Sequence, residues 1–313
     1  MAAASFAAGD WGTSHLRLFL CEPDGTVLES ADGPGAAAAG GRFASILEEL
    51  LAPWRQRHGP LPAVLCGMVG SSIGWIEAPY VACPVRPEAI AGRCVSPGGA
   101  VYVVPGLSCR NRFDAPDFLR GEETQILGAL ACDCALRRGR HLLCLPGTHT
   151  KWVVLQDGAV SEFLSAPAGE LYGLLRDHSI LVGDHAGPAG LAGAFEQGLM
   201  QFNRFPEAQL LHRLFECRAR RLSGELAPQD AAAYLSGLLI ASDVGGALGG
   251  LRDALSAGTV HLIGAGDLMA LYARALAAHD CAATQLEGTR ASLVGLAHLH
   301  SQLTARPVKH AAH

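Results

Sequence analysis

The chain has 313 residues, a length that fits two domains of about 150 residues each better than one core. Hydrophobic residues make up 50% and charged residues 17%, which predicts a compact folded protein and excludes bulk disorder. The formal net charge of -5 excludes the basic excess of a nucleic-acid binder, so an anionic ligand would need a few local cations.

The beginning of the sequence predicts a cytoplasmic protein. MAAASFAAGDWG has no basic n-region and reaches Asp10 too early for a secretory signal. No later apolar run approaches the ~20 residues of a membrane span, so we expect no membrane contact. The ten cysteines lack paired zinc-site spacing and are predicted to be buried free thiols.

The strongest structural signal is an internal repeat. Residues 6–30 read FAAGDWGTSHLRLFLCEPDGTVLES, and residues 142–165 read LLCLPGTHTKWVVLQDGAVSEFLS. Each segment contains an apolar strand, a Gly-Thr turn, a second apolar strand, an Asp-Gly hairpin and a third strand. The Gly-Thr turns at 12–13 and 147–148 correspond in the repeat. Both halves are therefore predicted to open with the same three-stranded meander.

A weaker repeat pairs AVLCGMVG at 63–70 with TVHLIGAG at 259–266, each a buried-type strand that leads into a glycine turn. Apolar spacing predicts helices over 43–57, 122–138, 169–177, 207–222, 229–243, 267–278 and 289–303. Strand-rich openings followed by helices, twice over, indicate two α/β lobes, with a boundary near residue 139. We expect lobes over 1–139 and 140–313, and the last helix is a candidate to pack back on the N-terminal lobe.

The two Gly-Thr hairpins are candidate phosphate-binding turns. Glycine lets the backbone approach an anion, and consecutive amides can point at it. In DWGTSHLR, Asp10 ends the first strand, where a carboxylate could hold Mg²⁺ directly or through water. Taken alone, Asp-x-Gly-Thr can be a plain hairpin turn. The second copy at Gly147 favours the phosphate interpretation.

The segment FLRGEETQILGALA begins a helix about twenty residues before the second hairpin. Glu122 and Glu123 lie in its first turn, where carboxylates are also favoured by the helix dipole. Two adjacent carboxylates beside Arg120 can instead divide the roles of proton acceptor and metal ligand. We favour the catalytic interpretation over helix capping.

Lys151 and Lys309 are the only lysines, whereas the chain has 24 Lys and Arg residues in total. A compact ammonium suits a crowded site beside phosphate or carboxylate better than an arginine fork. Lys151 is therefore a candidate contact for a phosphate or carboxylate oxygen of a ligand, and chance placement is the alternative.

The stretch GMVGSSIGWIEAPY at 67–80 follows a predicted strand, the usual place for a ligand in an α/β lobe. We expect Ser71, Ser72 and Trp75 to contact the substrate. Residues 70–74 also match a serine-hydrolase elbow, but an elbow must lead into a helix and the residues that follow have no helical spacing. The later turn at Gly264 and Gly266 has the form of a nucleotide-binding turn, and plain helix packing explains it equally well.

Taken in order, the blocks DWGTSHLR, GMVGSSIGW, APY, PGL, RGEETQILGA, PGTHTKW, LSGLLI and the late glycine turn resemble the 2-dehydro-3-deoxygalactonokinases, from Asp10 to about Leu299. The resemblance implies transfer of the γ-phosphate of ATP, with Mg²⁺, to the 6-hydroxyl of 2-dehydro-3-deoxy-D-galactonate. It also implies an α/β fold, the duplicated actin-like (ribonuclease H-like) two-lobe sugar-kinase fold with an interlobe cleft.

The resemblance also implies a distribution of roles along the chain. The residues implied to bind phosphate are Asp10, Gly12 and Thr13 in the first hairpin and Gly147 and Thr148 in the second, with Gly264 and Gly266 at the adenosine. Glu122 resembles the acidic residue that serves ATP hydrolysis in the heat-shock chaperone relatives. Leu145 stands where the wider superfamily usually has Asp, which leaves the metal ligand of the second lobe open.

Two other functions remain open at the level of the sequence: a kinase of another small aldonate or keto sugar, and a non-catalytic ATP-binding protein of the same fold. The epimer preference, and which of Glu122 and Glu123 is the base, are likewise open, with Glu122 favoured. The expected partners are a sugar acid and ATP, without nucleic acid, and a homodimer is a sensible prior.

Overall fold

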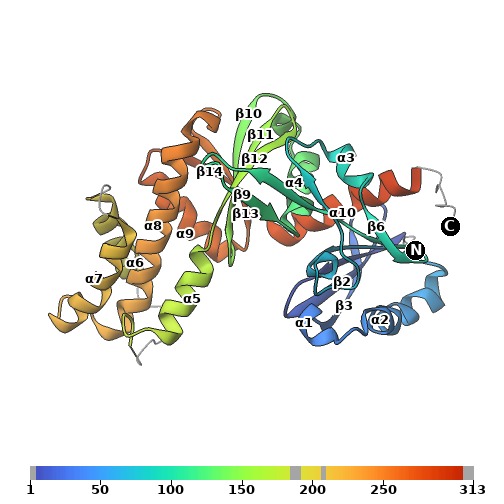
Figure 1. Ribbon diagram of the computed structural model, residues 1–313, viewed down its shortest axis with the longest axis horizontal. Helices are drawn as coiled ribbons and strands as arrows, with labels where there is room; N and C mark the ends of the chain where they lie inside the picture. The colour runs from blue at the N-terminus through green and yellow to red at the C-terminus, as the bar shows by residue number, and fades with distance from the viewer. Residues whose placement is uncertain (1–4, 184–191, 206–208, 306–313) are drawn as a thin grey trace. The chain divides into compact units, whose positions relative to one another are not determined.

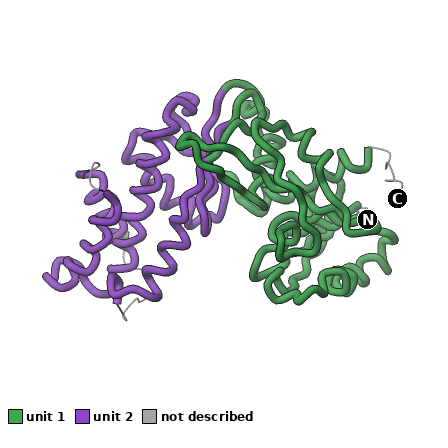
Figure 2. Tube along the Cα trace, viewed as in Figure 1, with its two compact units in different colours: residues 1–139, 155–163, 286–313 green, residues 140–154, 164–285 purple. Residues whose placement is uncertain are grey.

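The computed structural model describes residues 5–183, 192–205 and 209–305 (Figure 1). The chain divides into two compact units (Figure 2). Unit 1 comprises residues 1–139, 155–163 and 286–313, and unit 2 comprises residues 140–154 and 164–285. The chain therefore leaves unit 1 after Gly139 and returns to it twice, the second time for its last helix.

The main sheet of unit 1 has the strand order β3-β2-β1-β4-β7-β6. Its strands are β1 (Phe6–Trp11), β2 (His15–Cys21), β3 (Val27–Pro34), β4 (Ala63–Gly67), β6 (Val95–Gly98) and β7 (Val101–Val103). β1 pairs antiparallel with β2, which pairs antiparallel with β3, whereas β1 and β4 run parallel. β2 alternates exposed and buried residues because one of its faces covers the core.

The second sheet repeats this arrangement in the order β12-β11-β10-β13-β14. Its strands are β10 (Arg140–Leu145), β11 (Thr150–Gln156), β12 (Ala159–Ala166), β13 (Thr259–Gly264) and β14 (Ala282–Glu287). β10 and β13 run parallel, as β1 and β4 do. Both predicted repeats are thereby confirmed: each sheet places a meander beside a later parallel strand that ends in a glycine turn. The α/β duplicated fold class is confirmed with them.

The helices follow the predicted spans closely in most places. They are α1 (Ala36–Ala39), α2 (Phe43–His58), α3 (Pro87–Ala91), α4 (Glu122–Cys132), α5 (Ala168–His178), α6 (Ala192–Asn203), α7 (Leu210–Leu222), α8 (Ala231–Leu251), α9 (Gly266–Ala277) and α10 (Gly288–Ala305). The prediction for 122–138 was too long, because Asp133 ends α4 and accepts the Ala135 N–H at 2.9 Å, which starts a separate 3₁₀ turn. Residues 207 and 208 of another predicted helix lie outside the described residues.

The prediction for 229–243 was too short. α8 continues to Leu251 through a glycine-rich stretch because Val244, Ala247 and Leu248 extend its buried face. Helices α1, α3 and α6 were not predicted, and neither was a small sheet in the order β5-β8-β9. Its strands are β5 (Tyr80–Ala82), β8 (Gly106–Arg110) and β9 (Pro116–Leu119).

Each unit contains a helix pair held in close contact by glycine. In unit 1 a side chain at Gly128 of α4 would overlap the Ala291 carbonyl of α10, and one at Gly295 would overlap the Thr124 carbonyl. In unit 2 Gly198 of α6 and Gly237 of α8 play the same part. These contacts fix the start of α4 and the α6–α8 wall, where the candidate functional residues lie.

All ten cysteines are free thiols. Five are buried, which fits the prediction, but Cys132 and Cys134 are exposed because they flank the end of α4. Within the described ranges one stretch, Pro228–Ala254, is long and apolar enough to cross a membrane. It contains α8 and is mostly buried, as expected for a core helix of unit 2.

Candidate active site

The first Gly-Thr turn of unit 1 joins β1 to β2 and is braced by α1. The Gly12 N–H donates to the His15 carbonyl at 2.9 Å, and the Gly12 carbonyl accepts from the Ala36 N–H at 2.9 Å. A side chain at Gly35 would overlap the backbone of Thr13 and Ser14, so only glycine permits this contact. Thr13 is exposed at the tip. The turn is rigid and open to a ligand.

Asp10 lies at the end of β1, between Arg17 on β2 and Cys66 on β4. Arg17 Nη2 donates to Asp10 Oδ2 at 2.5 Å, and the Asp10 side chain is 30% exposed. Burial, together with the charge of Asp10, raises the pKa of the Cys66 thiol well above its ordinary value. Asp10 is therefore a half-buried carboxylate beside a neutral thiol and a counter-charge.

The described residues contain no cluster of three or more His, Cys, Asp or Glu side chains that could cage a metal. Mg²⁺ commonly takes one or two protein carboxylates and completes its shell with phosphate oxygens and water. A single accessible carboxylate beside a phosphate-type turn fits that requirement. Asp10 is thus suited to a magnesium ion that is bound together with a nucleotide.

Glu122 and Glu123 begin α4 and have different environments. Glu122 Oε2 accepts the Arg120 N–H at 3.0 Å, and Glu123 Oε2 accepts the Gly121 N–H at 2.6 Å. Both carboxylates therefore bond to backbone N–H groups just before the helix, rather than to the N–H groups of its first turn, which the capping interpretation expected. Glu122 remains partly exposed, whereas Glu123 is 0% exposed.

Burial, followed by the neighbouring charge of Glu122, raises the pKa of Glu123 to about 8. Within the described part of the chain its Oε1 has no hydrogen-bond partner. In this arrangement Glu123 is closed to a ligand, so Glu122 is the carboxylate that a substrate can reach.

Arg120 lies beneath the loop that follows β4. Its Nη2 donates to the Ala78 carbonyl at 2.9 Å, and its guanidinium lies 4.3 Å from the centre of the Tyr80 ring. Its Nη1 is buried and finds no partner among the described residues. Gly70 makes room for this group, because a side chain there would come within 2.8 Å of Nη1. Arg120 therefore has one donor group that no described residue satisfies, and in this arrangement that group is buried.

The loop itself is not a hydrolase elbow, because 3₁₀ and bend geometry, not a helix, follows β4 through residue 79. Ser71 Oγ donates to the Met68 carbonyl at 2.7 Å. Ser72 is exposed, and Trp75 packs partly buried against the core of unit 1. Of the three predicted substrate contacts, Ser72 is the most accessible.

The second Gly-Thr turn lies in unit 2 between the start of α5 and the end of β13. The Thr148 carbonyl accepts the Glu170 N–H at 2.9 Å, and His149 Nε2 lies 2.7 Å from Glu170 Oε2. A side chain at Gly169 would overlap the Gly147 carbonyl, and one at Gly264 would come within 3.3 Å of the Pro146 carbonyl. The structure thus places Gly264 beside Pro146, the residue that precedes Gly147 and Thr148 of the turn.

Lys151 follows on β11 and is 6% exposed. Its Nζ donates to Ser165 Oγ on β12 at 2.6 Å. The ammonium is therefore held in place by the protein. A ligand would have to add to this contact or replace it.

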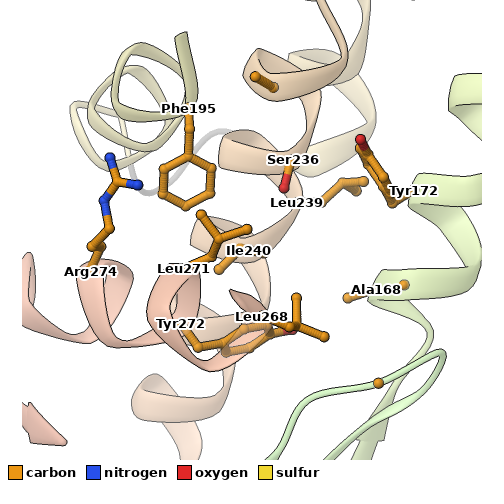
Figure 3. Close-up of a pocket in the computed structure, with 13 residues that line it drawn as sticks. Ala168, Tyr172, Phe195, Ser236, Leu239, Ile240, Leu268, Leu271, Tyr272 and Arg274 are labelled. Atoms are coloured by element: carbon orange, nitrogen blue, oxygen red, sulfur yellow. The ribbon is translucent and has the colours of Figure 1, made fainter. Parts of the chain in front are cut away.

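A cavity of about 240 Å³ in unit 2 begins at the second Gly-Thr turn (Figure 3). Its walls come from α5, α6, α8 and α9, and the lining residues are Gly147, Ala168, Gly169, Tyr172, Phe195, Ala233, Ser236, Leu239, Ile240, Leu268, Leu271, Tyr272 and Arg274. Figure 3 shows Tyr172 and Ala168 on one side and Phe195 and Arg274 on the other. An apolar slot with a few hydroxyls suits a flat heteroaromatic ring.

The cavity was not predicted from the sequence. Gly264 and Gly266 do not line it, but Gly264 ends β13 and Gly266 starts α9, whose Leu268, Leu271 and Tyr272 do line it. The helical spacing of those three residues could have predicted that α9 has one apolar face. Arg274 on the same helix is paired with Glu196 and lies 4.9 Å over the Phe195 ring, which closes that side.

Comparison with known proteins gives consistent matches. The family model for 2-keto-3-deoxy-galactonokinase matches residues 10–299. A Rhizobium meliloti (strain 1021) protein, provisionally named 2-dehydro-3-deoxygalactonokinase, is 39% identical over 94% of this chain and 96% of its own length. The 2-dehydro-3-deoxygalactonokinase of Escherichia coli (strain K12) is 32% identical over 94% of this chain and 96% of its own.

A solved structure agrees with these sequence matches. The crystal structure of a Sinorhizobium meliloti protein, again provisionally named 2-dehydro-3-deoxygalactonokinase, superposes with a TM-score of 0.85 at 36% identity. The match covers 97% of this chain and 100% of that one.

Proposed function

The chain belongs to the 2-keto-3-deoxy-galactonokinase family, and from that membership we propose that it transfers the γ-phosphate of ATP to the 6-hydroxyl of 2-dehydro-3-deoxy-D-galactonate. The enzyme is a phosphotransferase with an alcohol group as acceptor. It acts on small molecules, and the proposed setting is the cytoplasm, without nucleic acid or membrane as partner.

One observation carries the nucleotide assignment: the apolar cavity of unit 2 starts at the second Gly-Thr turn. A base in the cavity would leave its phosphates at Gly147 and Thr148, where glycine lets the backbone approach. Gly264 and Gly266 support this site by placing β13 and α9 against it. The first turn, with Gly12 and Thr13, offers a second set of backbone groups for the phosphates.

The proposed acceptor side uses residues of unit 1. Glu122 is placed as the base that takes the proton of the attacking hydroxyl, because it is the accessible carboxylate of the pair. Arg120 is assigned to the substrate carboxylate, and Ser71, Ser72 and Trp75 lie in the loop whose Ala78 carbonyl Arg120 contacts.

Two further assignments remain proposals of the same kind. Lys151 is assigned to an anionic oxygen of ATP or of the sugar acid. Asp10 is assigned to Mg²⁺, which when bound would neutralise charge on the transferring phosphate. Glu123 supports α4 from its buried position and is not assigned a contact with the acceptor.

A coupled assay of ADP release tests the function. The purified chain is given Mg²⁺, ATP and a panel of sugar acids, with the matching free sugars as controls. We expect turnover with 2-dehydro-3-deoxy-D-galactonate and none with free sugars, and phosphorus NMR of the product should place the phosphate on the 6-oxygen. Turnover confined to another aldonate would make that aldonate the substrate. ATP binding without turnover of any sugar acid would contradict the proposed kinase activity.

The oligomeric state is a separate proposal. A homodimer is the commonest symmetric assembly of soluble enzymes. Size-exclusion chromatography with light scattering checks it, and a mass near the 32.6 kDa of one chain would contradict it.

A further inference from the structure

A buried hydrogen-bond network lies beneath the cavity of unit 2. Tyr272 Oη donates to Asp243 Oδ2 at 2.6 Å, and Trp152 Nε1 donates to Asp243 Oδ1 at 2.9 Å. Thr150 Oγ1 lies 2.7 Å from Tyr272 Oη. Thr150 and Trp152 come from β11, Asp243 from α8 and Tyr272 from α9, so the network joins three elements.

The protons of this network can be assigned. Burial, together with the charge of Asp243, raises the pKa of the Tyr272 phenol far above its ordinary value, so the phenol keeps its proton. Because that proton is donated to Asp243, the Thr150 hydroxyl can donate to Tyr272 Oη. Each oxygen of Asp243 thus has a donor, as a carboxylate at this depth requires. Asp243 is therefore engaged by the protein and is not available as a metal ligand.

The hydrogen-bond network connects the two parts of the proposed nucleotide site, the cavity and the second Gly-Thr turn. The Tyr272 ring lines the cavity (Figure 3). Thr150 is the first residue of β11 and is separated from Thr148 of the phosphate turn only by His149. A single hydroxyl therefore connects the wall of the cavity to the strand that carries the turn.

We propose that Tyr272 is a positioning residue, whose bond to Thr150 sets the second Gly-Thr turn for the phosphates of a nucleotide held in the cavity. The inference rests on the proposed function, because it takes the cavity as the base site. It adds that two parts of the Tyr272 side chain have different roles. The ring contacts the base, and the hydroxyl strengthens phosphate binding through its bond to Thr150.

Two ligands separate these roles. Adenosine fills a base site without phosphates, whereas ADP also needs the turn. Tyr272→Phe keeps the ring and removes the hydroxyl. One hydrogen bond is worth about tenfold in affinity, so titration calorimetry with Mg²⁺ should show ADP binding weakened about 10-fold and adenosine binding changed by less than about 2-fold.

Thr150→Val removes the same bond from the other side and should give the same selective loss of ADP affinity. Tyr234→Phe is the matched control. Tyr234 is another buried tyrosine of unit 2, 1% exposed, and its hydroxyl meets Glu216 at 3.1 Å beside a different hollow. Tyr234→Phe should bind both ligands like the parent chain.

The outcomes are distinct. Equal losses for adenosine and ADP in Tyr272→Phe would overturn the positioning role, since the hydroxyl would then act on the cavity alone. Unchanged binding of both ligands, even with a lower melting temperature, would also overturn it, because the network would then only hold the fold. If the parent chain binds neither adenosine nor ADP, the cavity is not a base site, and both the inference and the nucleotide assignment fail.

Discussion

Two neighbouring glutamates at the start of α4 show how one residue step changes the chemistry of a side chain. Glu122 and Glu123 both accept backbone N–H groups ahead of the helix, yet only Glu122 reaches the surface. Successive residues on a helix point about 100° apart, so one faces outward and the other faces the core near Cys66. A sequence can place two carboxylates together, but their exposure depends on the packing of the whole unit.

We expect Glu122→Gln to lower kcat by about 10²- to 10⁴-fold with a smaller change in KM, because it removes the proposed base and keeps the shape. Steady-state kinetics with ATP and the sugar acid measures both constants. Glu123→Gln is the matched control and should keep most of the turnover, since the side chain is closed to a ligand. The reverse result, in which Glu122→Gln keeps parental turnover and Glu123→Gln has none, would make Glu123 the base.

Glu123 should make stability fall as the pH rises. Its pKa is about 8 in the folded chain against an ordinary value of 4.5, so between these values the folded state keeps a proton that the unfolded state has lost. The free energy of unfolding therefore falls across that window, by at most about 1.4 kcal/mol per pH unit. Glu123→Gln removes this slope.

Urea unfolding of both chains at several pH values between 5 and 8 measures the effect. We expect the stability of Glu123→Gln relative to the parent chain to increase steadily with pH. Two parallel curves would mean that Glu123 titrates alike in the folded and unfolded states.

Asp10→Asn should lower kcat by orders of magnitude and raise the Mg²⁺ concentration needed for half-maximal rate, because it removes the proposed metal ligand. The change keeps the shape but weakens the ion pair with the exposed Arg17, a pair that contributes little to stability. Magnesium titrations of the rate and a melting curve check both expectations. An unchanged magnesium dependence would remove Asp10 from the metal site.

At the scale of elements, the contact between α5 and the second Gly-Thr turn leaves no room for a side chain. A side chain at Gly169 would overlap the Gly147 carbonyl, so Gly169→Ala must displace either the helix or the turn. We expect a loss of about 1–3 kcal/mol in stability and a raised KM for ATP. Chemical unfolding and ATP saturation curves measure the two effects.

Gly173→Ala on the same helix is the control. Nothing lies within 4 Å of an added side-chain carbon at Gly173. Alanine should therefore stabilise α5 by about 0.4–1 kcal/mol and leave the KM for ATP unchanged. If both variants behave alike, the close contact with Gly147 does not determine the geometry of the turn.

Elements with a local pattern could be predicted from the sequence, and those defined by distant packing could not. The two meanders were readable because alternating apolar strands and Asp-Gly turns occur twice in the same order. α6 was missed because its glycines, including Gly198, lower helix propensity, although Gly198 is there for close packing against α8. The cavity was missed because four helices far apart in the sequence line it, and periodicity reports only that a residue is buried.

In the candidate site, too, contacts between residues far apart in the sequence could not be predicted. The sequence brought Gly147, Thr148 and Gly264 into one hypothesis, and in the structure Gly264 lies beside Pro146, which precedes the turn. It could not indicate that Asp243 and Tyr272 complete the support of that turn, because their partners lie more than ninety residues away on β11. Hydrogen bonds over such sequence separations leave no periodic trace.

At the scale of the whole molecule, the charge distribution agrees with the proposed substrates. The chain has a net charge of -5, yet the proposed reaction brings together a carboxylate and a triphosphate. The cations near the candidate residues are Arg17, Arg120 and Lys151, each already held by a protein contact. Such fixed cations lose little entropy on binding, and overall negative charge disfavours unrelated polyanions.

The path of the chain predicts that the last helix is required for the first unit to fold. α10 belongs to unit 1, although residues 164–285 of unit 2 precede it. Its Leu296 and Leu299 are buried, Phe6 of β1 stacks on His300 with ring centres 4.4 Å apart, and Gly295 lies against the Thr124 carbonyl of α4. Truncation after Gln285 would uncover β1 and the glutamate-bearing helix.

We expect the chain truncated after Gln285 to be insoluble, or to melt well below the parent chain, because uncovering an apolar core face removes a large part of the roughly 5–15 kcal/mol by which a folded protein is stable. Truncation after Ala305 is the matched control, since it keeps every described residue of α10. Soluble yield and thermal melting by circular dichroism compare the two. A soluble chain ending at Gln285 with the parental melting temperature would show that unit 1 forms its core without α10, and that the return of the chain to this unit is dispensable for folding.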